Sequence, residues 1–144
     1  MTLHLIKLCV GAESVDSLNG WIAERLADKR KRGLPAEQVH VTRMTPKRRD
    51  EILAGGSLFW VIKGVIECRQ RILDLRPVEG EDGIRRCGIV LEPKTVLIDP
   101  RPRGPFQGWR YLKAEDAPGD LGAEATDTAM PAQMRRELAE LGLL

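Results

Sequence analysis

The segment TRMTPKRRDEILAGGSLFWVIKGVIECRQR, residues 42–71, decides the predicted fold, because it joins a basic turn to the most apolar run of the chain. Thr45 is a favourable N-cap, and Pro46 suits the first position of a helix, where its missing N–H group would be unpaired anyway. The two glycines that follow, at positions 55 and 56, can adopt the left-handed conformation that ends a helix. We therefore expect a short helix over residues 46–54.

Two strands are expected after this helix. Residues 57–63 are apolar on both faces, which predicts a strand that is covered from both sides and lies centrally in its sheet. In residues 65–75 the side chains alternate, and Arg69 and Arg71 fall on the same face. Two arginines two residues apart on a strand can hold successive phosphates, and they also occur where a sheet is solvated. Both interpretations of this pair stay open.

The flanking sequence supplies further strands and one long helix, which the periods of two and of three to four residues indicate. Together these patterns predict a fold of the α+β class. The expected elements are a strand over residues 2–10, a helix from Ser14 to Gly33, a strand over 38–43, an acidic hairpin loop over 79–83, and strands over 85–91 and 95–98.

A chain of 144 residues has the length of one domain and can bury a substantial core. We expect residues 1–114 to form a single α+β domain. The composition then shifts to Ala, Gly, Asp, Thr and Pro, which predicts an acidic linker over residues 115–130. Residues 131–144 are expected to form a C-terminal helix with an apolar side.

The composition is that of a soluble globular protein, with 42 % apolar and 31 % charged residues. The longest apolar run, residues 58–62, is too short to cross a bilayer, and the first residues lack the features of a signal peptide. The protein is therefore expected in the cytoplasm and away from membranes. The 3 cysteines are widely spaced, which is typical of reduced thiols and favours neither a disulfide framework nor a metal cluster. No cofactor or metal is predicted.

The net charge of +2 conceals a segregation of charge along the chain. Residues 29–114 hold 19 Lys and Arg against 10 Asp and Glu, a balance of 19 − 10 = +9. Residues 1–28 hold 2 against 4, and residues 115–144 hold 2 against 7. A basic centre between acidic ends favours a polyanionic partner.

Two basic segments are candidate binding sites for such a partner. Three cations occupy residues 47–49, at the expected start of a helix, where free N–H groups bind phosphate. The same run could equally be a solvated turn balanced by the acids that follow it. Residues 99–112, DPRPRGPFQGWRYL, interleave arginine with aromatic residues, and such rings stack on bases while guanidinium groups bind phosphates. Trp109 and Tyr111 share one strand face, so they could instead complete the core.

His40 is the candidate for acid–base chemistry. It lies close in sequence to Arg43 and to the basic turn, so it could act on a bound phosphate compound. A single histidine is also commonly a structural residue that makes hydrogen bonds.

The blocks TRMTPKRRDEILAGGSLFWVIKG, CRQRILDL and PFQGWRYLKAEDAP closely resemble a family of small bacterial proteins known as domain of unknown function 1489. The likeness covers the chain from its start to about Leu121, and it implies no catalytic residue because the family has no established activity. More loosely, the order of elements resembles that of PUA-like domains, including the ASCH and EVE groups. This second resemblance implies a small, mixed, mostly antiparallel β-barrel flanked by helices, and binding of RNA or modified bases.

These observations predict a nucleic-acid-binding module whose partner is RNA, favoured over DNA, or a modified nucleotide. One alternative is a small enzyme that acts on a nucleotide or another phosphorylated compound, with His40 as acid or base. Another is a protein interaction module whose acidic tail masks its own basic face. The usual enzyme motifs are absent from the sequence. The residues expected to bind phosphate are Arg43, Lys47, Arg48, Arg49, Lys63, Arg69, Arg71, Arg101, Arg103 and Arg110, and those expected to stack on or read bases are Gln107, Trp109 and Tyr111.

Overall fold

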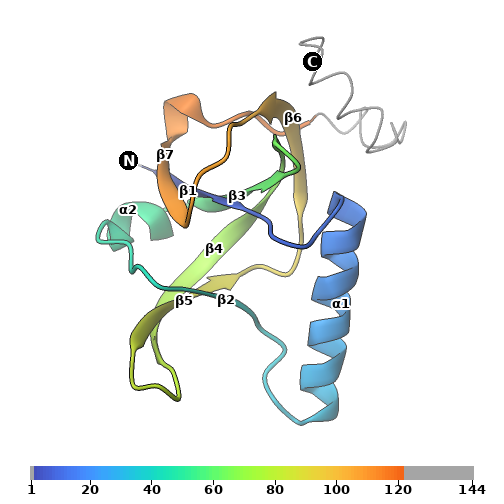
Figure 1. The fold of residues 1–144 in the computed structure, drawn as a ribbon, viewed down its shortest axis with the longest axis vertical. Helices are drawn as coiled ribbons and strands as arrows, with labels where there is room; N and C mark the ends of the chain where they lie inside the picture. The colour runs from blue at the N-terminus through green and yellow to red at the C-terminus, as the bar shows by residue number, and fades with distance from the viewer. Residues whose placement is uncertain (1, 122–144) are drawn as a thin grey trace.

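The computed structural model describes residues 2–121, which form one sheet and two α-helices (Figure 1). The predicted C-terminal helix and all but the first part of the predicted linker lie outside the described residues. The elements are β1 (Leu3–Leu8), α1 (Val15–Lys31), β2 (Gln38–Thr42), α2 (Arg49–Leu53), β3 (Ser57–Ile62), β4 (Val65–Glu79), β5 (Arg85–Leu91), β6 (Val96–Pro102), β7 (Trp109–Lys113) and a 3₁₀ turn, η1 (Ala114–Asp116).

The seven strands are ordered β2-β5-β4-β3-β1-β7, and β6 pairs with β4 beside this path. β1 and β3 run parallel, with Leu5 opposite Leu58, and the other neighbouring strands run antiparallel. The predicted α+β class with a mixed, mostly antiparallel sheet is therefore confirmed.

The expected barrel is wrong, because the sheet does not close. Among residues 2–121, β2 pairs only with β5 and β7 pairs only with β1, so both strands are edges of the described sheet. A side-chain contact links these two edges instead of a ladder of backbone hydrogen bonds. The indole N–H of Trp109 in β7 donates to the carbonyl oxygen of Met44, in the loop that follows β2, at 2.9 Å.

Alternation along the central strands divides the apolar core into two clusters on opposite faces of the sheet. Leu5 and Trp60 belong to the first cluster, to which α1 and α2 contribute apolar residues. Ile6 and Phe59 belong to the second cluster, against which Phe106 packs. All six residues of β3 are buried, which confirms the prediction of a central strand covered from both sides.

The long helix follows the prediction closely. The Ser14 hydroxyl accepts a hydrogen bond from the backbone N–H of Ser17 at 3.1 Å, which satisfies one of the free donors at the start of α1. Val15, Leu18 and Ile22 are buried on one side of the helix. Three cations in the last turn lie where the helix dipole is negative, and this arrangement stabilises the helix.

The short helix begins later than predicted. α2 starts at Arg49, its N-cap is Arg48, and no side chain caps it, so Thr45 is not the N-cap that the sequence suggested. The reason is a tertiary contact: the backbone N–H of Lys47 donates to the hydroxyl oxygen of Tyr111 at 2.9 Å, which holds residues 43–48 as a loop against β7.

Two strands, β4 and β6, are longer than predicted. β4 continues to Glu79, and β6 continues to Pro102, so only residues 103–108 remain as a loop before β7. Among the described residues, no helix combines the length and apolarity that a bilayer span requires.

Candidate nucleic-acid interface

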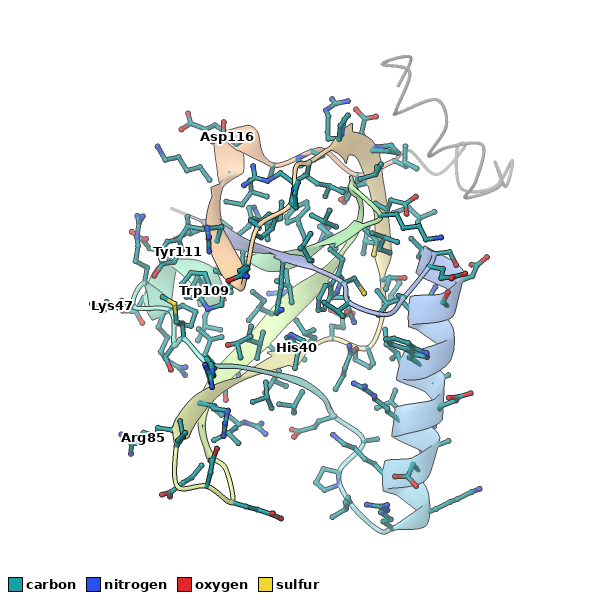
Figure 2. All side chains as sticks on the ribbon, viewed as in Figure 1. His40, Lys47, Arg85, Trp109, Tyr111 and Asp116 are labelled. Carbon is teal, nitrogen blue, oxygen red and sulfur yellow. The ribbon has the colours of Figure 1, made fainter. Side chains whose placement is uncertain are left out.

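Strand β7 presents different side chains on its two sides. It is an edge strand that pairs with β1, with Tyr111 opposite Leu5 and Arg110 opposite Ile6. Trp109 and Tyr111 lie on the side of the first core cluster and of the 43–48 loop, and Arg110 lies on the side of the second cluster. Figure 2 shows Trp109, Tyr111 and Lys47 close together at this end of the sheet.

The two aromatic residues of β7 have different roles. Trp109 is only 7 % exposed, and its ring packs edge-on against Tyr111 with 4.9 Å between centroids. Trp109 is thus a core residue, and the expectation that it stacks on bases finds no support. Tyr111 is 38 % exposed, and its hydroxyl is fixed by the Lys47 N–H group. Tyr111 is therefore an oriented ring at the surface.

One guanidinium group lies against this ring. The Cζ atom of Arg48 is 5.8 Å from the Tyr111 centroid, within the range of a cation–π contact. Arg48 also forms an ion pair with Glu51 at 2.5 Å, which raises the pKa of Arg48 and lowers that of Glu51. Both side chains are more than a third exposed, so this pair contributes little to stability.

A second group of cations surrounds Phe106 in the 103–108 loop. The Cζ atoms of Arg103 and Arg110 lie 5.0 Å and 5.7 Å from the centroid of its ring. Arg110 also donates through Nη1 to the carbonyl oxygen of Gln107 at 2.7 Å. Within the described part of the chain, neither arginine forms an ion pair with a carboxylate.

The other predicted phosphate-binding residues do not join these two groups in one groove. Three of them are paired with acids: Arg49 with Asp74, Arg69 with Asp120 and Arg101 with Asp99, at 2.7 to 2.8 Å. Arg43 and Gln107 are exposed in the loops on either side of β7, and Arg71 is exposed on β4. Lys63 lies in the turn between β3 and β4, with a positive φ of 48°.

His40 is a half-buried residue on β2, and its ring packs edge-on against Trp60 with 5.1 Å between centroids. Burial, and then the nearby charges of Lys7 and Arg25, lower the pKa of His40 to about 4. At neutral pH the imidazole is therefore uncharged. Its Nε2 atom is buried and has no hydrogen-bond partner among the described residues.

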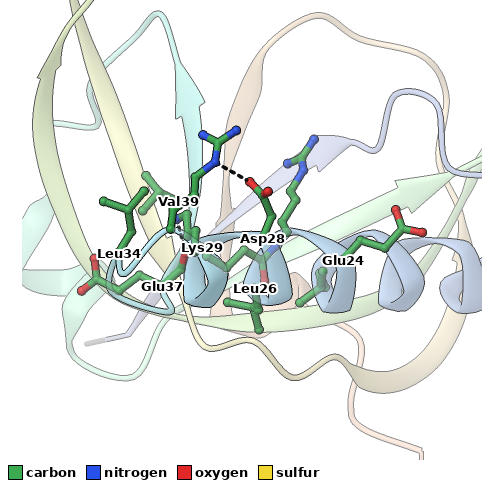
Figure 3. Close-up of a pocket in the computed structure, with 11 residues that line it drawn as sticks. Glu24, Leu26, Asp28, Lys29, Leu34, Glu37 and Val39 are labelled. Carbon is green, nitrogen blue, oxygen red and sulfur yellow. Dashed lines mark hydrogen bonds and ion pairs between the residues drawn. The ribbon is translucent and has the colours of Figure 1, made fainter.

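A cavity of about 400 Å³ lies between α1 and the chain leading into β2 (Figure 3). Ile22, Leu26 and Val39 supply apolar lining, and charged side chains of both signs surround them. His40 does not line this cavity, so the structure does not supply here the pocket that an enzyme using His40 requires.

A buried hydrogen-bond network beside His40 was not anticipated from the sequence. The indole N–H of Trp60 donates to Oε1 of Gln70 at 2.9 Å, and Nε2 of Gln70 donates to Gln38 Oε1 and to the Glu92 carbonyl. Gln70 is fully buried. The network joins β2, β3, β4 and the turn after β5, so it has a structural role. Its only sequence signal was one glutamine on the apolar face of a strand.

Comparison with known proteins identifies the family of this chain. A family model described as "Protein of unknown function (DUF1489)" matches residues 5–144, and the chain belongs to this family. No curated protein and no solved structure matches the chain, so the looser resemblance to PUA-like domains gains no support.

Proposed function

We propose that this member of the DUF1489 family binds single-stranded nucleic acid, with RNA favoured over DNA, along the edge strand β7. The observation that carries the proposal is the pairing of cations with aromatic rings on both sides of this strand. We call this surface the β7 rim. It consists of Lys47, Arg48 and Tyr111 on one side, and Arg103, Phe106 and Arg110 on the other.

The chemistry of the β7 rim suits unpaired nucleotides. An exposed ring can stack on a base of any sequence, and guanidinium groups beside it can bind the adjacent phosphates. Tyr111 loses little freedom on binding, because its hydroxyl is already held by the Lys47 N–H group. Arg103 and Arg110 have no carboxylate to displace within the described part of the chain, so phosphate binding costs them no ion pair.

The β7 rim is smaller than the groove expected from the sequence. It holds four of the predicted cations, one of which, Arg48, is paired with Glu51. Arg49 and Arg101 lie outside the rim and are paired with neighbouring acids. For single strands the slope of log K against log salt is about −0.7 per phosphate contacted. Four contacts therefore predict a slope of about −3, and binding that is weak at high salt.

The test uses a fluorescently labelled 12-nucleotide oligouridine, with anisotropy measured over a range of salt concentrations. Arg110→Glu should weaken binding at least about tenfold and make the slope shallower by about 0.7. Arg85→Glu is the matched control, because Arg85 is an exposed arginine at the far end of the β5 hairpin (Figure 2). Equal loss in both variants would show non-specific attraction and would remove the case for the rim.

The role of the ring is tested separately. Tyr111→Phe keeps the stacking surface and loses only the hydroxyl that orients the ring, so it should bind oligouridine no more than about threefold more weakly than the parent. Tyr111→Ala should lose about fivefold to a hundredfold. The matching oligodeoxythymidine measures the preference for RNA. If wild-type protein binds neither oligonucleotide at low salt, the proposal is wrong.

A further inference from the structure

Arg69 binds an anionic side chain of the same chain, on the side of β4 that carries the second core cluster. Its Nε and Nη2 atoms donate to the two carboxylate oxygens of Asp120, each at 2.8 Å. The remaining nitrogen, Nη1, donates to the hydroxyl of Ser57 at 2.9 Å. Ser57 is buried, with 1 % of its surface exposed, so the guanidinium group is fixed from behind while two donors point outward.

This two-point contact is the arrangement that arginine uses for carboxylate and for phosphate alike. The hydrogen bonds to Arg69 lower the pKa of Asp120, so the acid is ionised at neutral pH. Asp120 thus occupies a position in which a phosphate group would satisfy the same donors.

A short segment carries Asp120 to this position. The Gly119 carbonyl accepts from the Asp99 N–H at 2.8 Å, and the Leu121 N–H donates to the Leu97 carbonyl at 3.0 Å. These two hydrogen bonds form one isolated antiparallel β-bridge, between Asp120 and Ile98 of β6. A bridge of this size at a sheet edge opens at low cost compared with the strands of the core.

Arg71 lies beside this ion pair. It is two residues further along β4, on the same face as Arg69, and it is exposed. Within the described residues it forms no ion pair, so Asp120 neutralises one arginine of the two and leaves the second uncompensated.

We propose that Arg69, Ser57 and Arg71 form a phosphate-binding site that Asp120 covers in the free protein and yields to an incoming phosphate group. This inference rests on the proposed function insofar as the phosphate belongs to RNA. Arg110, Ile6, Phe59 and Arg69 occupy one row across β7, β1, β3 and β4. Three strand spacings of about 4.8 Å separate the ends of this row, so Arg69 lies about 14 Å from Arg110, on the side of the sheet that carries the second core cluster. A strand of a few nucleotides spans that distance.

The first experiment measures binding of inorganic phosphate by NMR, from the shift of the Arg69 side-chain Nε–Hε signal. Asp120→Asn removes the competing charge and keeps the shape of the side chain. The phosphate concentration that half-saturates the protein should therefore be about fivefold lower in this variant, as expected for loss of one solvated ion pair. Asp116→Asn is the matched control: it removes an equal charge from the same segment, where Asp116 is exposed and forms no ion pair within the described residues (Figure 2). It should behave like the parent.

A second variant tests whether phosphate binds at this site, so that a structural effect of Asp120→Asn is not mistaken for binding. Arg71→Gln leaves the Arg69 contacts intact and should weaken phosphate binding in both the parent and the Asp120→Asn background. If the half-saturating phosphate concentration is the same in Asp120→Asn, Asp116→Asn and the parent, the proposal that Asp120 covers the site is wrong.

A third measurement separates the two proposals. Oligouridine should bind about fivefold more tightly to Asp120→Asn than to the parent at low salt. Tighter phosphate binding without any binding of oligouridine in either protein would support the anion site and refute the RNA proposal. If Asp120→Asn binds both oligouridine and phosphate as the parent does, the proposed site is refuted. The proposal for the β7 rim then stands.

Discussion

Acidification should destabilise the protein through His40, by an amount that follows from its surroundings. In the folded chain the pKa of His40 is about 4, whereas in the unfolded chain it is close to 6.5. Above pH 6.5 the residue is neutral in both states, and its contribution to stability is complete. Between pH 6.5 and pH 4 the unfolded state takes up a proton that the folded state rejects, so stability falls as the pH falls.

The size of this loss can be worked out from the two pKa values. They differ by 6.5 − 4, or about 2.5, and each pKa unit corresponds to about 1.4 kcal/mol, so the full loss is about 3.5 kcal/mol. At pH 4 the folded state is itself half protonated, so about 3 kcal/mol of this loss is reached there. Burial is the larger cause and the cations Lys7 and Arg25 the smaller, so added salt should reduce the loss only slightly. A change of this size is a large part of the stability of a small domain.

The assay is urea denaturation at pH 7 and pH 4 for the parent and for His40→Phe. The carboxylates titrate in both proteins, as does His4, whose pKa is also lowered by burial and by Arg69. The difference between the two proteins therefore isolates His40. The parent should lose about 3 kcal/mol more than the variant on acidification. If both proteins lose the same amount, His40 is not buried as neutral imidazole, and the account of its environment is wrong.

Other substitutions test the packing directly, each by thermal or urea denaturation. Gly56→Ala should destabilise by about 2–3 kcal/mol, because its Cβ would lie 2.3 and 2.4 Å from two backbone carbonyl oxygens, and mild destabilisation would show that this contact is loose. Gly20→Ala, in α1 where a Cβ meets nothing within 4 Å, should stabilise by about 0.5–1 kcal/mol, and a loss would contradict the open space there. Gln70→Ala should cost about 3 kcal/mol because a buried indole N–H and a carbonyl lose their partner; a neutral effect would rule out the network. Tyr111→Phe should cost no more than about 1.5 kcal/mol, since the bond to the Lys47 N–H is solvated.

Much of the fold could be predicted because it depends on local patterns. The alternation of apolar residues identified β3 as a strand covered on both faces, and Ser14 marked the start of α1. The start of α2 could not be predicted in the same way. Thr45 and Pro46 favour a helix locally, but a hydrogen bond from Lys47 to Tyr111, 64 residues away, holds this segment as a loop.

The candidate site was harder to predict because pairing between charges depends on topology. The balance of +9 in residues 29–114 suggested many available cations. Arg49 is paired with Asp74, 25 residues along the chain, and Arg69 with Asp120, 51 residues along. No count of charges in sequence reveals such partners. The closure of the sheet was mispredicted for a related reason, since it depends on whether two distant edge strands meet.

Chemical-shift mapping with oligouridine tests the central claim most directly. Backbone amide signals of the assigned protein are followed while unlabelled oligonucleotide is added at low salt. The account predicts that the largest changes fall in residues 43–48 and 103–113, which form and flank the β7 rim, with further changes around Arg69. Changes confined to α1 and β2, around the cavity of Figure 3, would contradict the claim, and so would the absence of any change.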